Sequence, residues 1–161
     1  MTLEDLARRV QILEDMEAIK QLKARYCAAC DNHYDADAPA ALFTEDALWD
    51  GGAVLGRYEG REAMRRFFQG SAQRLSCASH HVTNPLLEVQ GDTATGQWYL
   101  FQPCTRTDNN QAIWLAAHYN ETYVRSNGAW HFQRRHIVPA FYTPFDQGWA
   151  QQRFLSNPQG R

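Results

Sequence analysis

Several features of membrane, secreted and nucleic-acid-binding proteins are missing from this sequence. It has no run of eighteen apolar residues, the length at which a stretch becomes a candidate membrane-spanning helix. Its 16 basic and 18 acidic residues leave a net charge of −2, whereas a nucleic-acid-binding domain concentrates basic charge on one face. Residues 1–10 lack the continuous apolar core of a signal peptide. We therefore expect no nucleic-acid or membrane partner, and a cytoplasmic location.

Cysteine is scarce, with four in 161 residues, and their spacing excludes two kinds of site. Cys27 and Cys30 form a Cys-x-x-Cys pair, but no second pair of ligands lies at a spacing that completes a zinc site. A thioredoxin-type motif belongs between a strand and a helix, whereas this pair falls late in a helical pattern. We interpret the pair as small apolar residues of a helix in a reducing compartment.

The N-terminal half has a helical period. Apolar residues recur at three- and four-residue steps, which predicts an amphipathic helix from the N-cap Thr2 to about Asp31. Its apolar face contains Leu3, Leu6, Val10, Leu13, Met16, Ile19, Leu22 and Tyr26. Further along, the pattern predicts a short helix over 36–42, a strand over 47–50, a turn at 51–52, a returning strand over 54–58 and a helix over 60–75.

From residue 80 the period changes to that of strands. Four β-rich segments follow, at 80–89, 93–105, 112–125 and 130–138, and Asn127-Gly128 between the last two is a strong hairpin signal. Helices followed by a meander of strands indicate an α+β fold, with helices on one face of a mostly antiparallel sheet. We expect one domain over 1–161. Its aromatic segment 140–161 is a C-terminal extension that could close a pocket or pack on a neighbouring subunit.

An acid/base site is the chemistry that these elements could build. Asp31 lies at the predicted helix end and His80 opens a strand, and a carboxylate can orient an imidazole and raise its basicity. Strand alternation puts His80, Val82 and Asn84 on one face and His81 on the other. On the last strand it groups Trp130, Phe132, Arg134 and His136, and the sequence leaves open which face points inward.

A set of short motifs occurs in a familiar order. They are Tyr26, Asp31, 41–47, 60–63, 80–85, 88–94, Tyr119 and 128–130. Together they make the chain similar to the SnoaL-like branch of the nuclear transport factor 2-like (ketosteroid-isomerase-like) superfamily, up to about Pro139. The resemblance implies a cone-shaped, cystatin-like α+β barrel. In such a fold a curved mixed, mostly antiparallel sheet wraps around the N-terminal helices and encloses a deep pocket.

The resemblance also implies an activity. The enzymes of this branch include scytalone dehydratase, bile acid 7α-dehydratase and lindane dehydrochlorinase, which are lyases without cofactor or metal that use an Asp–His pair. By this resemblance Asp31 and His80 are the catalytic pair, and Tyr26 donates a proton to a carbonyl or departing oxygen. The implied reaction is an elimination from a hydrophobic, aromatic or polycyclic small molecule, with loss of water or of a small carbonyl such as formaldehyde. The substrate-binding candidates are Trp49, Tyr119, Arg134, His136 and Phe141.

Two other functions stay open at this point. One is a ketosteroid-type isomerase, in which an acidic residue moves a proton and no group departs. The other is a noncatalytic ligand-binding or assembly module. The remaining histidines His33, His81 and His118 are not expected to act in catalysis. Because an open curved sheet leaves apolar strand surface to cover, we expect a homo-oligomer. The resemblance to the lyases of this branch implies a trimer, which is favoured over a dimer.

Overall fold

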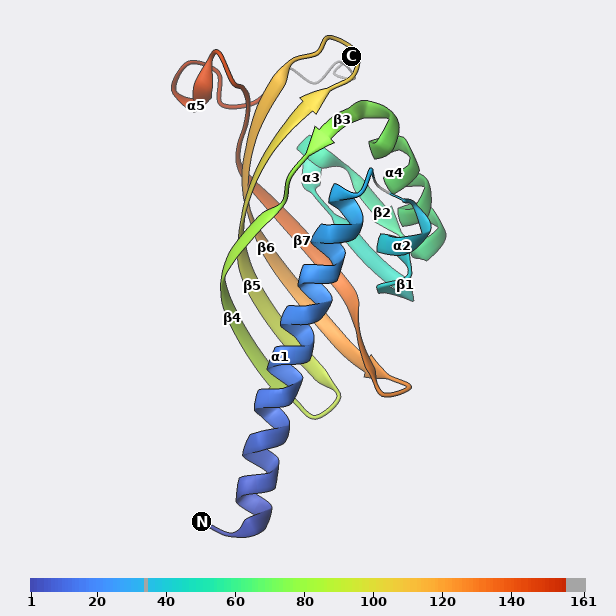
Figure 1. Cartoon of the computed structure of the whole chain (residues 1–161), viewed down its shortest axis with the longest axis vertical. Helices are drawn as coiled ribbons and strands as arrows, with labels where there is room; N and C mark the ends of the chain where they lie inside the picture. The colour runs from blue at the N-terminus through green and yellow to red at the C-terminus, as the bar shows by residue number, and fades with distance from the viewer. Residues whose placement is uncertain (34, 156–161) are drawn as a thin grey trace.

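A long N-terminal helix and a strongly curved sheet make up most of this protein (Figure 1). The computed structural model describes residues 1–33 and 35–155. The helices are α1 (Leu3–Asp31), α2 (Asp37–Ala40), α3 (Gly52–Leu55), α4 (Arg61–Arg74) and α5 (Gly148–Gln151). The strands are β1 (Phe43–Asp50), β2 (Arg57–Glu59), β3 (Leu75–Ala78), β4 (His81–Gln90), β5 (Thr93–Arg106), β6 (Ala112–Ser126) and β7 (Ala129–Pro144).

The sheet has the order β2-β1-β7-β6-β5-β3, and β4 also pairs with β5. The pairing of β1 with β7 is parallel and the other pairings are antiparallel. The inner half of α1 lies across the concave side of β4–β7, while α2 and α4 cover the end near β1 and β2 (Figure 1). The predicted α+β class, with a curved mixed sheet around N-terminal helices, is confirmed.

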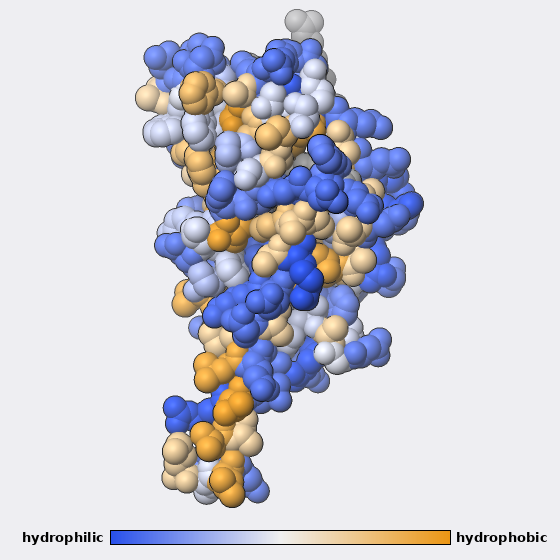
Figure 2. Space-filling model, in the orientation of Figure 1, coloured by the Kyte–Doolittle hydropathy of each residue, from blue (hydrophilic) through white to orange (hydrophobic). Residues whose placement is uncertain are grey.

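Helix α1 has the predicted bounds, but its apolar face is only partly buried. Thr2 caps it in a capping box with Asp5, and Ile19, Leu22 and Tyr26 are buried against the sheet. In contrast, the first members of the same face are exposed: Leu3 (85%), Leu6 (43%), Val10 (44%) and Leu13 (65%). The reason is that the first turns of α1 project beyond the sheet, where Figure 2 shows a strip of apolar surface.

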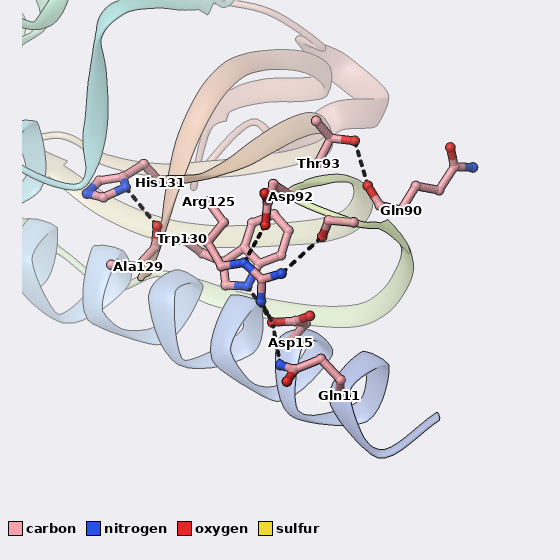
Figure 3. Close-up of polar contacts among 10 residues, drawn as sticks. Gln11, Asp15, Gln90, Asp92, Thr93, Arg125, Ala129, Trp130 and His131 are labelled. Atoms are coloured by element: carbon pink, nitrogen blue, oxygen red, sulfur yellow. Dashed lines mark hydrogen bonds and ion pairs between the residues drawn. The ribbon is translucent and has the colours of Figure 1, made fainter. Parts of the chain in front are cut away.

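Asp15 marks the point where α1 meets the sheet (Figure 3). Its Oδ1 accepts hydrogen bonds from Arg125 Nη1 at 2.6 Å and from Trp130 Nε1 at 3.0 Å, and Arg125 also contacts Asp92. These contacts fix the helix to the β4–β5 and β6–β7 hairpin ends. From Asp15 to Asp31 the helix rises about 24 Å, so the same rigid element carries Asp31 to the other end of the sheet.

Several boundaries differ from the predicted ones. Strand β1 begins at Phe43, four residues before the predicted strand, and α2 is shorter than the predicted helix over 36–42. Residues 52–55 form a helical turn that takes up the start of the returning strand predicted over 54–58, and only Arg57–Glu59 return along β1. Leu75 opens the unpredicted strand β3 because α4 ends at Arg74. Strand β7 continues past Pro139 to Pro144, so the first part of the expected C-terminal extension belongs to the sheet.

A β-bulge in β7 overturns the predicted alternation of that strand. Tyr123 pairs with Phe132 and Thr122 with Arg134, which leaves Gln133 as an extra residue. The inward face therefore shifts by one residue, and Arg135 and Ile137 follow Trp130 and Phe132 into the interior. Arg134 and His136, which we expected beside the substrate, are exposed instead.

The prediction that Asn84 lies on the same face of β4 as His80 is also wrong. Asn84 adopts a left-handed conformation (φ 56°) at an irregularity in β4 and is exposed, so it does not share the inner face with His80. Among residues 1–33 and 35–155, no helix is long and apolar enough to cross a membrane.

Candidate active site

Asp31 and His80 meet although 49 residues separate them in the chain. Asp31 is the last residue of α1, and His80 lies in the short link between β3 and β4. The Asp31 Oδ1 atom lies 2.6 Å from His80 Nδ1, and the carboxylate also accepts the backbone N–H of His80 at 3.0 Å (Oδ2) and 3.1 Å (Oδ1). The His80 side chain is 4% exposed and that of Asp31 is 32% exposed. The sequence pattern thus named two side chains that are in direct contact.

The contact fixes both the orientation and the tautomer of the imidazole. An ionised carboxylate only accepts hydrogen bonds, so a neutral His80 must carry its proton on Nδ1. The same carboxylate also accepts from the His80 backbone, so one group positions both the main chain and the ring of His80. The Nε2 atom is then the nitrogen whose lone pair can accept a proton.

His80 forms part of the wall of a pocket of about 770 Å³. Three residues that the sequence analysis named, Tyr26, Trp49 and Tyr119, line the same pocket, and Asp31 stands behind His80. The aromatic part of the wall consists of Tyr26, Trp49, Tyr58, Phe67, Tyr119, Tyr142 and Phe154. These aromatic side chains, with an imidazole beside them, suit a flat, hydrophobic molecule, and polar residues such as Gln102 and Arg106 also line the pocket.

Tyr26 packs edge-on against the imidazole. Its ring centre lies 6.3 Å from that of His80, and the two planes are 80° apart. The guanidinium carbon of Arg135 lies 3.8 Å from the centre of the Tyr26 ring. A cation at this distance is attracted to the face of the ring, so Arg135 helps to hold the Tyr26 ring in its position beside His80.

Phe141 does not line the pocket. It stacks on Trp149 of the following segment, with ring centres 4.7 Å apart, and so lies away from the position beside the substrate that we expected. Its neighbour Tyr142 does line the pocket, together with Phe154 and Leu155 of the returning chain. The last part of the predicted extension, residues 156–161, lies outside the described residues.

A second charged cluster, which the sequence analysis missed, lies deeper in the core. Glu121 Oε1 contacts Lys23 Nζ at 2.7 Å and Arg135 Nε at 2.5 Å, and Oε2 accepts a hydrogen bond from Tyr123. The side chains of Lys23, Glu121 and Arg135 are at most 2% exposed. Within the described part of the chain, the two Nη atoms of Arg135 have no hydrogen-bond partner. We call Lys23, Glu121 and Arg135 the sealed cluster.

Burial governs the ionisation of the sealed cluster. It lowers the pKa of Lys23 to about 7, although Glu121 acts in the opposite direction. Burial also tends to raise the pKa of Glu121, but the charges of Arg135 and Lys23 outweigh it and bring that pKa below its ordinary value. The Nζ atom of Lys23 also lies 3.4 Å from the ring centre of Tyr119. Burial raises the pKa of the Tyr119 phenol well above its ordinary range.

The remaining histidines and the Cys-x-x-Cys pair do not join the Asp31–His80 contact. His81 is exposed and contacts Ser79, while His118 is exposed on the outer face opposite to Tyr119. His33 is exposed just after α1. Cys27 and Cys30 are free thiols within α1, and burial raises the pKa of Cys30 to about 12. The described residues contain no group of three or more His, Cys, Asp or Glu side chains arranged to hold a metal ion.

With this geometry in view, comparisons with known proteins define the family. The SnoaL-like domain model matches residues 11–136, and the chain belongs to this family of the nuclear transport factor 2-like superfamily. An uncharacterised protein of Mycobacterium tuberculosis (strain ATCC 25618 / H37Rv) is 28% identical over 125 residues, which cover 76% of this chain and 84% of that protein.

Two solved structures extend the comparison to enzymes. A hexachlorocyclohexane dehydrochlorinase (LinA type 3) from Novosphingobium barchaimii LL02 is 26% identical, with a TM-score of 0.75 over 95% of this chain and 99% of the other. A protein from Novosphingobium aromaticivorans DSM 12444, provisionally described as a scytalone dehydratase, is 25% identical, with a TM-score of 0.77 over 92% and 95%. The fold and these neighbours support a lyase-type activity on a small molecule.

Proposed function

We propose that this protein is a cofactor-independent lyase that eliminates water, or a small carbonyl such as formaldehyde, from a hydrophobic ring compound. The contact of 2.6 Å between Asp31 and His80 on the wall of the pocket carries this proposal. A carboxylate-held imidazole is a general base, and such a group typically contributes about 10²- to 10⁴-fold to a rate. The lyases among the structural neighbours support the same class.

The proposed steps follow from the positions of three side chains. Asp31 keeps the proton of His80 on Nδ1, and Nε2 removes a proton from a substrate carbon. The electrons of that C–H bond form a double bond to the neighbouring carbon as its C–O bond breaks. Tyr26 gives its proton to the departing oxygen, which leaves as water, and His80 then returns the first proton to Tyr26. The aromatic wall holds the ring in place, and this positioning supplies the rest of the rate.

The chain end contributes to enclosure in this proposal. Tyr142, Phe154 and Leu155 line the pocket, so we infer that residues 140–155 limit the access of water to the bound substrate. The four free thiols fit a reducing compartment and support the cytoplasmic location proposed here.

The proposed function is tested by a substrate screen followed by two single variants. Hydroxylated cyclic ketones are incubated with the protein, and the absorbance of a new conjugated double bond is followed. His80→Ala should lower the rate about 10²- to 10⁴-fold, while His81→Ala, a change at the exposed neighbour, should leave it unchanged. Equal rates for wild type and His80→Ala would show that the elimination does not use this site.

We also propose that the protein forms a homo-oligomer, with a trimer as the favoured state. The outer face of the sheet exposes large apolar side chains, among them Tyr99 (52%), Phe101 (39%) and Val138 (42%). Phe101 stacks on Trp114, and Trp114 packs on Phe145, so the outer face has a continuous aromatic strip. Such a strip is suited to a subunit contact. Light scattering after size-exclusion chromatography should give three times the chain mass, and a monomer would contradict this proposal.

A further inference from the structure

Gln102 lies on the pocket wall directly beside the candidate catalytic histidine. Ala78 pairs with Cys104 in one strand pairing and His81 pairs with Phe101 in the next, so His80 falls opposite Gln102. The backbone N–H of Ser79 donates to the carbonyl of Pro103 at 3.1 Å, which shows that the strands stay paired between these points. Opposite residues of an antiparallel pair have Cβ atoms about 4.5–5.5 Å apart. Both side chains line the pocket.

On the neighbouring strand β6, the residue opposite Gln102 is apolar. Gln102 pairs with Leu115, and Leu115 pairs with Tyr142, so His80, Gln102, Leu115 and Tyr142 form a row across the pocket wall. Burial raises the pKa of Tyr142 to about 12, so its phenol stays protonated near neutral pH. Within this row, Gln102 is the polar group next to His80.

Gln102 is a buried residue, but the protein does not use the hydrogen-bonding capacity of its carboxamide, which borders the pocket. Gln102 is 6% exposed, and its side chain makes no hydrogen bond with the residues that the structure describes. A carboxamide offers two N–H donors and one carbonyl acceptor. Neither carboxamide atom is among the fully buried polar atoms that lack a partner in the described residues, so both remain open to the pocket. A ligand in the pocket could satisfy these groups.

We propose that Gln102 binds an oxygen substituent of the substrate, a hydroxyl or a carbonyl, close to the carbon from which His80 removes a proton. This inference rests on the proposed function and narrows its substrate to oxygenated ring compounds. A hydroxyl group can both donate to and accept from a carboxamide, whereas a carbon-bound chlorine cannot donate and accepts only weakly. The substrate class of this protein therefore differs from the chlorinated ring that gives the dehydrochlorinase neighbour its name.

A binding experiment with two probes of equal shape tests the role of Gln102. The probes are 2-tetralol and tetralin, which share a bicyclic skeleton and differ by one hydroxyl group. Dissociation constants are measured by calorimetry for wild type, Gln102→Leu and the matched control Gln97→Leu, which alters an exposed glutamine on the outer face of β5. We expect wild type and Gln97→Leu to bind 2-tetralol about tenfold more tightly than tetralin, the effect of roughly one buried hydrogen bond.

Gln102→Leu should abolish the preference for 2-tetralol while it binds tetralin at least as tightly as wild type does. Should that variant fail to fold, Gln102→Met replaces the amide with a side chain of equal length. The proposal is overturned if a folded Gln102 variant keeps the preference, if wild type prefers tetralin, or if wild type fails to bind 2-tetralol. Asp31→Asn, which should lower turnover strongly, should keep the preference for 2-tetralol. A failed lyase hypothesis can therefore be told from a failed role of Gln102.

Discussion

Two groups of charged side chains lie along α1 about two helical turns apart, and they differ in what can reach them. Asp31 is one-third exposed, and its partner His80 borders the pocket. Lys23, by contrast, contacts Glu121 and Arg135 where all three side chains are at most 2% exposed. A substrate can therefore meet the first group, while the sealed cluster meets only other side chains of the protein.

This difference in accessibility indicates that the Asp31–His80 pair serves the reaction and that the sealed cluster supports the structure. The Asp31–His80 pair can exchange a proton with a ligand, because it borders a cavity. The sealed cluster joins α1 to β6 and β7, and it places the Arg135 cation under the ring of Tyr26. Loss of the pair should therefore reduce the rate, whereas loss of the cluster should reduce stability.

The largest expected effect is that of Asp31→Asn on turnover. An asparagine amide can donate to Nδ1 of His80, which moves the imidazole proton to Nε2 and removes the base. We expect the rate to fall about 10²- to 10⁴-fold, with little change in the urea-unfolding midpoint. Asp35→Asn, in the exposed loop after α1, serves as the control and should leave the rate unchanged. A large loss of stability in Asp31→Asn would place the pair with the sealed cluster instead.

The next largest effect is that of Glu121→Gln on stability. This change removes the carboxylate that Lys23 and Arg135 share, so two buried cations lose their counter-charge. Breaking a buried ion pair on one side typically costs about 3–5 kcal/mol. Urea denaturation should show a loss of this size, whereas Glu88→Gln at an exposed position of β4 should change little. A near-neutral Glu121→Gln would mean that the cluster does not hold the fold together.

Lys23 should make stability depend on pH. Its pKa is lowered to about 7 in the folded protein, below the ordinary value near 10.4 of the unfolded chain. Between these values the unfolded state binds one proton more, so the free energy of unfolding rises with pH, by at most about 1.4 kcal/mol per pH unit. The free energy of unfolding, measured in urea from pH 7 to 9, should therefore rise with pH more steeply for wild type than for Lys23→Met. A constant difference would show that Lys23 stays protonated.

The smallest of these effects is expected at Asp15, whose contacts have intermediate exposure. Its partner Arg125 is 25% exposed, so solvent weakens their attraction more than in the sealed cluster. Asp15→Asn also weakens the hydrogen bond from Trp130, and we expect a loss of about 1–2 kcal/mol in urea denaturation. Asp92→Asn, at the more exposed partner of Arg125, should cost less than Asp15→Asn. A loss as large as that of Glu121→Gln would contradict the link between burial and effect.

The sequence predicted the pair better than it predicted the sealed cluster. The helical period ran to Asp31, and strand alternation separated His80 from His81, so both catalytic candidates followed from local patterns and the family resemblance. Glu121 also had a local signal, since it lies between Tyr119 and Tyr123 at the spacing of one strand face. Lys23 occupied a buried position of α1 next to Leu22, but a lysine is not recognised as buried from a period alone.

Arg135 and Gln102 were beyond reach for different physical reasons. Nothing in Phe132-Gln133-Arg134 marks a bulge, and without it Arg135 falls on the outer face. Gln102 does not titrate, so it attracts attention only when the register of β5 against the β3–β4 link is known. The first turns of α1 illustrate the opposite error, since apolar residues that the period predicts as buried are exposed. A helical period does not show where the sheet ends.

The protonation state of His80 tests the central claim most directly, because it needs no substrate. Nitrogen-15 NMR of the histidine rings at about pH 8, above the usual pKa of an imidazole, reports which ring nitrogen carries the proton. The His80 signals are identified as those that vanish in His80→Ala. The Asp31 contact predicts that Nδ1 carries the proton and that Nε2 is unprotonated. In Asp31→Asn the proton should move to Nε2. A proton on Nε2 in the wild-type protein would contradict the assignment of His80 as the base.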